Sequence, residues 1–214
     1  DPVEFKAGKP YELKVEHVQD KVGGRNHALV LFWQRSLPKR QYDQILERIA
    51  NDGTTLIVSG NETFQFAEEL DRRGLVKYNG RMVVERWWKA GAFFIVEHPL
   101  VKGLPQNTGM NWEYQDIARY EMTIDSAGEF KQEFEGKRYG LLLEGEEVAV
   151  FCTNGHQFEV ASAVSVVRHG KGKIVLSCLD LYPYLGDDSK SANSIKKILC
   201  NYIEYGTDAG ATAR

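Results

Sequence analysis

The sequence contains few cysteines and no long apolar run. Three cysteines in 214 residues, Cys152, Cys178 and Cys200, are too few and too irregularly spaced for a disulfide framework or a zinc site. Cys178 and Cys200 stand in apolar strand and helix contexts, so we expect both thiols to be buried and inert. No apolar run approaches the roughly 20 residues that a membrane-spanning helix needs, and we expect no membrane partner.

An excess of charge of one sign is also missing. The formal net charge of −3 gives no reason to expect nucleic acid or an anionic membrane as a partner. Lys39, Arg40, Arg72 and Arg73 are interpreted as solvated helix faces. With 43% hydrophobic and 27% charged residues, the composition is that of a globular protein, and residues 1–214 are long enough for a single domain. The chain begins with Asp-Pro rather than Met and has no secretory signal, so we expect a fragment of a longer protein.

The first half of the chain predicts alternating strands and helices. Continuous apolar runs over residues 27–33 and 54–60 are typical of strands buried in a parallel sheet. Pro38 opens a helix between them and Gly53 ends it. The helix carries one continuous apolar stripe, formed by Tyr42, Ile45, Leu46, Ile49 and Ala50. A second helix follows residue 61 and ends at Gly74, and this order favours βαβ units.

The second half predicts short strands joined by tight turns. Strands are expected over residues 11–18, 81–88, 90–98, 139–145, 148–155, 158–167 and 172–181. The Asn154-Gly155 pair indicates a hairpin, and residues 168–173 indicate another reversal. The chain closes with an amphipathic helix ending near Gly206, whose apolar face is formed by Ala192, Ile195, Ile198, Leu199, Tyr202 and Ile203. The fold class predicted from these elements is α/β.

Three stretches in order carry a resemblance to a known superfamily. "LPKRQYDQILERIANDGTTLIVSG" (residues 37–60) resembles the helix followed by a Gly-Gly-Thr-Leu strand of class I glutamine-amidotransferase-like domains. "EHPLVKGLPQNTGMNWEYQ" (97–115) is similar to the His-Pro-x-x-x-Gly-Leu-Pro segment of that superfamily. "HGKGKIVLSCLDLYPYL" (169–185) resembles the strand before the last helix in C-terminal domains of family 2 glycoside hydrolases.

The resemblance implies a particular fold and role. Such domains occur in the trimerisation regions of β-galactosidases and in trehalose-utilisation-type proteins. The implied fold is flavodoxin-like: a mainly parallel sheet flanked by helices, with added antiparallel strands in the second half. In glycosidases this domain usually serves as an accessory domain without chemistry of its own.

The turn at Ser59, Gly60, Asn61 and Glu62 is the first candidate site, because a strand meets a helix there. An active amidotransferase needs a Cys at this turn, where the helix N-terminus lowers the thiol pKa. None of the three cysteines lies near it. Ser59 lacks the first Gly of a Gly-x-Ser-x-Gly elbow and has no recognisable His partner. We interpret the turn as a degenerate, vacated elbow with Asn61 as helix cap, while a residual nucleophilic role of Ser59 stays open.

His98 and Asp180 are candidates for ligand binding, each with a structural alternative. His98 lies in a proline-rich loop and has no second ligand at metal spacing, so it could bind a ligand or simply hold the loop. Asp180 follows an apolar strand, where carboxyl ends of strands face ligand crevices in α/β folds, but it could equally cap a turn.

Aromatic residues offer a second candidate site. Trp87, Trp88, Trp112 and Tyr114 have flat faces suited to sugar rings, although aromatics more commonly fill cores and interfaces. Glu113 lies beside Trp112 and is included as a possible ligand-binding residue. Neither it nor the remaining acids shows a spacing typical of the paired carboxylates of a glycosidase.

These patterns lead to a ranked set of functions. The leading hypothesis is a non-catalytic accessory domain of a bacterial family 2 type glycoside hydrolase, exported to the periplasm or secreted, that contributes to domain packing, oligomerisation or the substrate entrance. Its partners would be other domains of the parent enzyme, possible further copies of itself and carbohydrate. A carbohydrate-binding module and a stand-alone hydrolase using Ser59, or Cys152 with His156, are the alternatives. No P-loop, dinucleotide fingerprint or metal-ligand cluster occurs, so no cofactor or metal is expected.

Overall fold

The computed structural model describes residues 28–31, 39–60, 62–84, 91–106, 108–109, 119–120, 136–154, 159–179, 181 and 190–207. The helices are α1 (Lys39–Asp52), α2 (Glu62–Arg72) and α3 (Lys190–Thr207), with a short 3-10 helix η1 (Pro99–Val101). The strands are β1 (Ala28–Leu31), β2 (Thr55–Ser59), β3 (Lys77–Val84), β4 (Gly91–Ile95), β5 (Thr108–Gly109), β6 (Arg119–Tyr120), β7 (Gly136–Glu144), β8 (Glu147–Asn154), β9 (Glu159–His169) and β10 (Gly172–Ser177).

The first unit of the fold is β1–α1–β2, as the alternation of apolar runs predicts. β1 and β2 pair in parallel, with Ala28 opposite Thr55. The predicted apolar stripe of α1 faces the core, where Tyr42, Leu46 and Ile49 are buried. Gly53 follows the helix at a φ of 74°, a left-handed conformation that favours glycine and ends the helix. The predicted βαβ unit is therefore confirmed.

α2 ends in a Schellman motif built around the predicted stop residue. The N–H of Gly74 donates to the carbonyl of Asp71 at 2.8 Å, and the N–H of Leu75 donates to the carbonyl of Leu70 at 3.0 Å. Two carbonyls that the helix would leave unpaired are satisfied in this way. Phe66 and Leu70 form the buried side of the helix.

The sheet is mixed, and this corrects the expectation of a mainly parallel one. Its ten strands include a continuous order of β1-β2-β10-β9-β8-β4-β5, with β3, β6 and β7 joined beside this path. Among the described strands, two pairs are parallel and seven are antiparallel. The small number of residues between β8 and β9 and between β9 and β10 accounts for this, because a connection of a few residues can join only antiparallel neighbours. The α/β class itself is confirmed.

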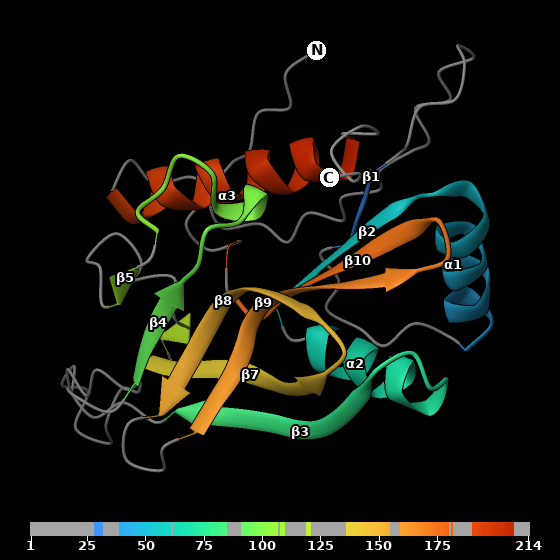
Figure 1. Ribbon diagram of the computed structural model, residues 1–214, viewed down its shortest axis with the longest axis horizontal. Coiled ribbons are helices and arrows are strands. Elements are labelled where there is room, and N and C mark those ends of the chain that lie inside the picture. Colours follow the sequence, from blue (N-terminus) through green and yellow to red (C-terminus); the bar gives the residue numbers. More distant parts are fainter. Residues whose placement is uncertain are drawn as a thin grey trace, which may run out of the picture.

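Helices cover both faces of the β2–β10 region, with α3 on one side of the strands and α2 on the other (Figure 1). Leu56 and Val58 of β2 pack with α1 and α2, whereas Ile57 packs with the side chains of α3. Successive residues of a strand point to opposite faces, so a strand covered on both sides is buried throughout. All five residues of β2 are buried for this reason.

The closing helix α3 is confirmed, but two of its residues lie differently from their predicted positions. Ile195, Ile198 and Tyr202 are buried against the sheet. Ile203, which was assigned to the apolar face, is 49% exposed, and Cys200, expected to be buried, is exposed too. At about 100° per residue, position 200 lies roughly opposite the buried pair Ile198 and Tyr202.

Two predicted strands are described only in part or not at all. β3 begins at Lys77, earlier than predicted, and its register against β7 shifts between Tyr78 and Arg81. Of the strand predicted over residues 81–88, only residues 81–84 belong to the described part of the chain, and the edge strand predicted over residues 11–18 lies outside it.

Candidate functional site

The turn at Ser59 lies where two parallel strands end side by side. Ser59 is the last residue of β2 and stands in register with Ser177, the last residue of β10. Gly60 follows at a φ of 80°, and a Cβ built on it would meet no atom within 4 Å. Backbone conformation, and not crowding, therefore favours glycine here. The carboxyl end of parallel strands is also the place where α/β folds bind ligands, which makes this turn the natural candidate site.

The polar groups of the turn are engaged in hydrogen bonds that join β2, α2 and β10. Ser59 is buried, and its Oγ donates to the carbonyl of Leu179 at 3.1 Å. The carbonyl of Ser177 accepts from both the Gly60 N–H at 3.0 Å and the Thr63 Oγ1 at 2.8 Å. The hydroxyl groups here serve as cross-links between backbone segments.

A second layer of hydrogen bonds ties the same turn to α3. The Oη of Tyr202 donates to the Oγ of Ser177 at 3.1 Å, and the N–H of Leu179 donates to the same oxygen at 3.4 Å. Burial raises the pKa of Tyr202 well above its usual range, so its hydroxyl keeps its proton and acts as a donor. Helix α3, whose apolar face was predicted only to pack in the core, therefore also contacts the candidate site through Tyr202.

The chemistry of this arrangement does not activate Ser59. A serine nucleophile needs a base that takes its proton, usually a histidine nitrogen within about 2.6–3.2 Å. Among the described residues, Ser59 hydrogen-bonds to a peptide carbonyl, which is not a base. The interpretation as a vacated elbow stays a prediction, because Asn61 and the side chain of Glu62 lie outside the described residues.

His98 is buried and both of its ring nitrogens have partners. Its Nδ1 accepts from the N–H of Leu100 at 3.1 Å, which caps η1, and its Nε2 lies 3.1 Å from Oε1 of Glu147. Burial lowers the pKa of His98 below its ordinary value of 6.5; Glu147 opposes this shift and Lys173 adds to it. Between its two alternatives, the contacts of His98 favour the one in which it holds the loop.

His98 is not placed as a partner of Ser59. Its ring centroid lies 5.5 Å from that of Tyr205, and the Nζ of Lys173 lies 4.0 Å from the same tyrosine ring. Lys173 is level with Thr55, four residues before Ser59, which corresponds to about 13 Å along the strands. The histidine and the serine therefore belong to separate hydrogen-bonded groups.

The three cysteines do not supply a nucleophile for the turn. Cys152 of β8 is fully buried in the core, in register with Phe93 and Ala161, so the alternative that uses it as a nucleophile loses its access to substrate. Burial raises the pKa of the Cys178 thiol well above its usual range, which keeps it protonated and unreactive. Cys200 is exposed on the outer side of α3.

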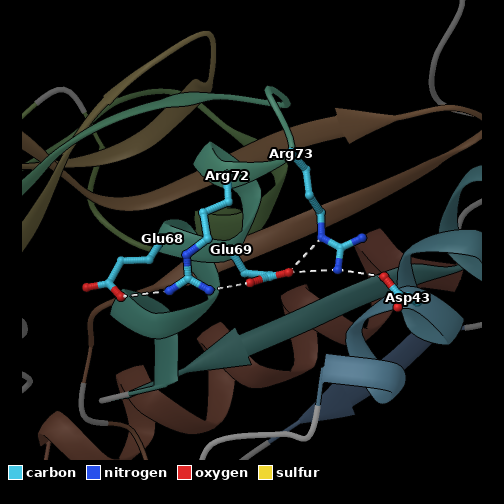
Figure 2. Close-up of polar contacts among 5 residues, drawn as sticks. All are labelled: Asp43, Glu68, Glu69, Arg72 and Arg73. Atoms are coloured by element: carbon cyan, nitrogen blue, oxygen red, sulfur yellow. Dashed lines mark hydrogen bonds and ion pairs between the residues drawn. The ribbon is translucent and has the colours of Figure 1, made fainter.

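An ion-pair network joins α1 to α2, and it was not anticipated from the sequence (Figure 2). Glu69 is buried, and its two carboxylate oxygens lie 2.7 Å from guanidinium nitrogens of Arg72 and Arg73 respectively. The Nη2 of Arg73 also lies 2.7 Å from Oδ1 of Asp43 on α1. Asp43 and Glu69 raise the pKa of Arg73. Arg73, which was interpreted as part of a solvated helix face, is only partly solvated: its side chain is 25% exposed and forms ion pairs with both Asp43 and Glu69. The spacing of Glu69 and Arg73, four residues apart on a helix, is the signal that could have identified the pair.

Several candidates fall on residues outside the described part of the chain. These are Asp180, Trp87, Trp88, Trp112, Glu113, Tyr114 and His156. Their predicted roles stay predictions.

Within the described ranges, no group of three or more His, Cys, Asp or Glu side chains is placed to hold a metal ion. No described helix is both long and apolar enough to span a membrane.

No family model matches the chain, and no curated protein matches it either.

Proposed function

We propose that this chain is a non-catalytic accessory domain of a carbohydrate-active enzyme, of the family 2 glycoside hydrolase type, with an amidotransferase-like, flavodoxin-like core. It contributes to packing against the other domains of the parent enzyme, to oligomerisation or to the shape of the substrate entrance. This proposal rests on the three resembling stretches and on the chemistry of the turn at Ser59.

The observation that carries the non-catalytic part is the hydrogen bond from Ser59 Oγ to the carbonyl of Leu179. A catalytic serine gives its proton to a base during attack, and a carbonyl oxygen cannot accept it. The other candidate residue, His98, uses its Nδ1 to cap η1, and its Nε2 contacts Glu147. The polar groups of the turn serve to bind four segments of backbone together.

The amidotransferase-like part draws support from the arrangement around β2. A βαβ unit leads into β2, a turn with a left-handed glycine follows, and α2 begins directly after it. β10, the strand within the third resembling stretch, is the parallel neighbour of β2 on its other side, and α3 closes the fold after it. β9, β8 and β4 extend the sheet with antiparallel pairs beyond this core.

The test combines activity with the size of the native protein. We expect the 214-residue chain to hydrolyse no chromogenic galactoside or mannoside, and Ser59→Ala to leave this result unchanged. An antibody against the chain should detect, in its source cells, a polypeptide several times larger than 24.3 kDa. Hydrolysis that disappears in Ser59→Ala would refute the proposal and favour the stand-alone hydrolase. A saturable tryptophan fluorescence change with the same sugars would favour the carbohydrate-binding module.

A further inference from the structure

His98 joins three parts of the fold that are far apart in the sequence. It follows β4, caps η1 through Leu100, and contacts Glu147 at the start of β8 and the ring of Tyr205 on α3. Its side chain is only 4% exposed, while that of Glu147 is 48% exposed. A buried imidazole thus connects a turn to a carboxylate that water can reach.

The hydrogen bonds of His98 define which of its nitrogens carries the proton. The N–H of Leu100 points to Nδ1, so Nδ1 must present its lone pair. The proton of the neutral ring is therefore on Nε2, which donates to Oε1 of Glu147. This bonding pattern exists only while His98 is neutral, because an imidazolium has no acceptor.

The turn that His98 caps is also held by α3. The Nδ2 of Asn201 donates to the carbonyls of Leu100 at 3.2 Å and Lys102 at 3.0 Å. The Oδ1 of Asn201 is buried and has no hydrogen-bond partner in the described part of the chain. The two hydrogen bonds that Asn201 donates therefore link η1 and the residue after it to α3.

We propose that His98, Leu100 and Glu147 form a pH-operated latch, the His98 latch, which holds η1 against α3 when the imidazole is neutral and releases it when the imidazole is protonated. Protonation places a hydrogen on Nδ1, facing the N–H of Leu100 at the 3.1 Å separation of the present bond. Two donors then oppose each other, and the cap of η1 is lost.

The titratable groups around His98 come from four elements, and their effects on its pKa act in both directions. The carboxylate of Glu147 on β8 favours the imidazolium, while Lys173 on β10 opposes it. Arg168 on β9 lies 3.5 Å from the other oxygen of Glu147 and partly neutralises it. Burial raises the pKa of Tyr205 on α3, so that this ring stays uncharged. The largest influence on His98 is its own burial, which lowers its pKa, and so the closed latch binds a proton more weakly than the open one.

This difference sets the direction and the size of the expected response. In the open state His98 is hydrated and titrates near its ordinary pKa of about 6.5. Below that pH the open state gains protons that the closed state does not bind, so opening increases by up to about tenfold per pH unit. The increase stops once the pH falls below the pKa of the closed latch.

The test is amide hydrogen exchange of Leu100 and Lys102, followed by NMR in the 214-residue chain between about pH 7.5 and pH 5. Protection factors are compared, because the intrinsic exchange rate itself changes with pH. His98→Asn places an amide oxygen where Nδ1 was, so it keeps a good cap and cannot titrate. His98→Gln keeps a donor toward Glu147 but removes the cap. His169→Asn is the matched control, a histidine substitution at the end of β9 and outside the latch.

The latch predicts that the protection of Leu100 in the native chain falls between pH 7.5 and pH 5, by at most about tenfold for each pH unit below 6.5. It should change by less than about twofold in His98→Asn, be low at every pH in His98→Gln, and behave as native in His169→Asn. Protection that stays constant while the ring of His98 titrates in the native NMR spectrum would overturn the proposal, and this readout needs no variant. An equal fall in His98→Asn would also overturn it, since another group would then be responsible.

Discussion

Replacing Ser59 by alanine separates a structural hydroxyl from a catalytic one. The substitution removes a single oxygen atom and leaves a side chain of nearly the same shape, so no sizeable cavity forms. What is lost is the hydrogen bond from Ser59 Oγ to the carbonyl of Leu179, a contact between residues 120 positions apart. We therefore expect a loss of folding stability.

The size of the loss follows from the burial of the carbonyl that is left behind. Leu179 is only 3% exposed, so water cannot easily replace the missing donor. A neutral hydrogen bond contributes about 0.5–1.5 kcal/mol net, and an unpaired buried acceptor costs about 1–3 kcal/mol. We expect Ser59→Ala to lower the free energy of unfolding by about 1–2 kcal/mol.

Ser165 provides a matched control for the same chemical change. It is fully buried in β9, and its Oγ has no hydrogen-bond partner among the described residues. Removing a buried hydroxyl that makes no bond relieves a desolvation cost. We expect Ser165→Ala to leave the stability unchanged or to raise it by up to about 1 kcal/mol.

Urea unfolding followed by circular dichroism measures both changes. With an m-value of about 2–3 kcal/mol/M, the midpoint of Ser59→Ala should fall by about 0.3–1 M relative to the native chain. The midpoint of Ser165→Ala should stay level or rise. If Ser59→Ala were as stable as the native chain while Ser165→Ala lost stability, the assignment of a structural role to the Ser59 hydroxyl would be wrong.

Three further predictions concern the ion pairs, the closing helix and pH. In urea unfolding, Glu69→Gln should lower the free energy of unfolding by about 1–2 kcal/mol, because Arg72 and Arg73 lose the buried carboxylate that they share. Its control, Glu68→Gln, removes an exposed ion pair with Arg72 and should cost less than about 0.5 kcal/mol. Ile198→Ala should cost about 2–4 kcal/mol by leaving a cavity under α3, and Ile203→Ala less than about 1 kcal/mol; equal losses would contradict the placement of this helix. Because the pKa of His98 in the folded state lies below 6.5, its contribution to stability is fully present above pH 6.5 and is lost as the pH falls through that folded-state pKa. The free energy of unfolding should therefore differ less between about pH 5 and pH 7.5 in His98→Asn than in the native chain.

Most of the elements could be predicted from local patterns. The stripe of α1, the stops at Gly53 and Gly74, and the two reversals around β9 each depend on residues within about ten positions of one another. The side-chain period of a helix or strand and the left-handed preference of glycine act at that range. The same reasoning wrongly assigned Ile203 to the buried face of α3. An apolar stripe gives the direction of the buried face but not its width, which depends on how much of the helix the sheet covers.

The candidate site was only half predictable. The turn at Ser59 was recognised from a strand leading into a helix, but its hydrogen-bond partners Leu179 and Ser177 could not be. The position of His98 in a loop was evident, yet its contact with Glu147 requires β4 and β8 to be neighbours. Strand order depends on contacts across the whole chain, which no local pattern contains.

The sequence by itself determined the α/β class, the buried strands, the amphipathic helices and the absence of a cysteine from the turn at Ser59. The tertiary structure alone decided that β10 lies beside β2, that antiparallel pairs outnumber parallel ones among the described strands, and that Glu69 is buried. The physical reason is the range of the forces involved. Backbone preference and apolar periodicity act between neighbours in the chain, whereas burial, pKa and hydrogen-bond partners are set by residues that only folding brings together.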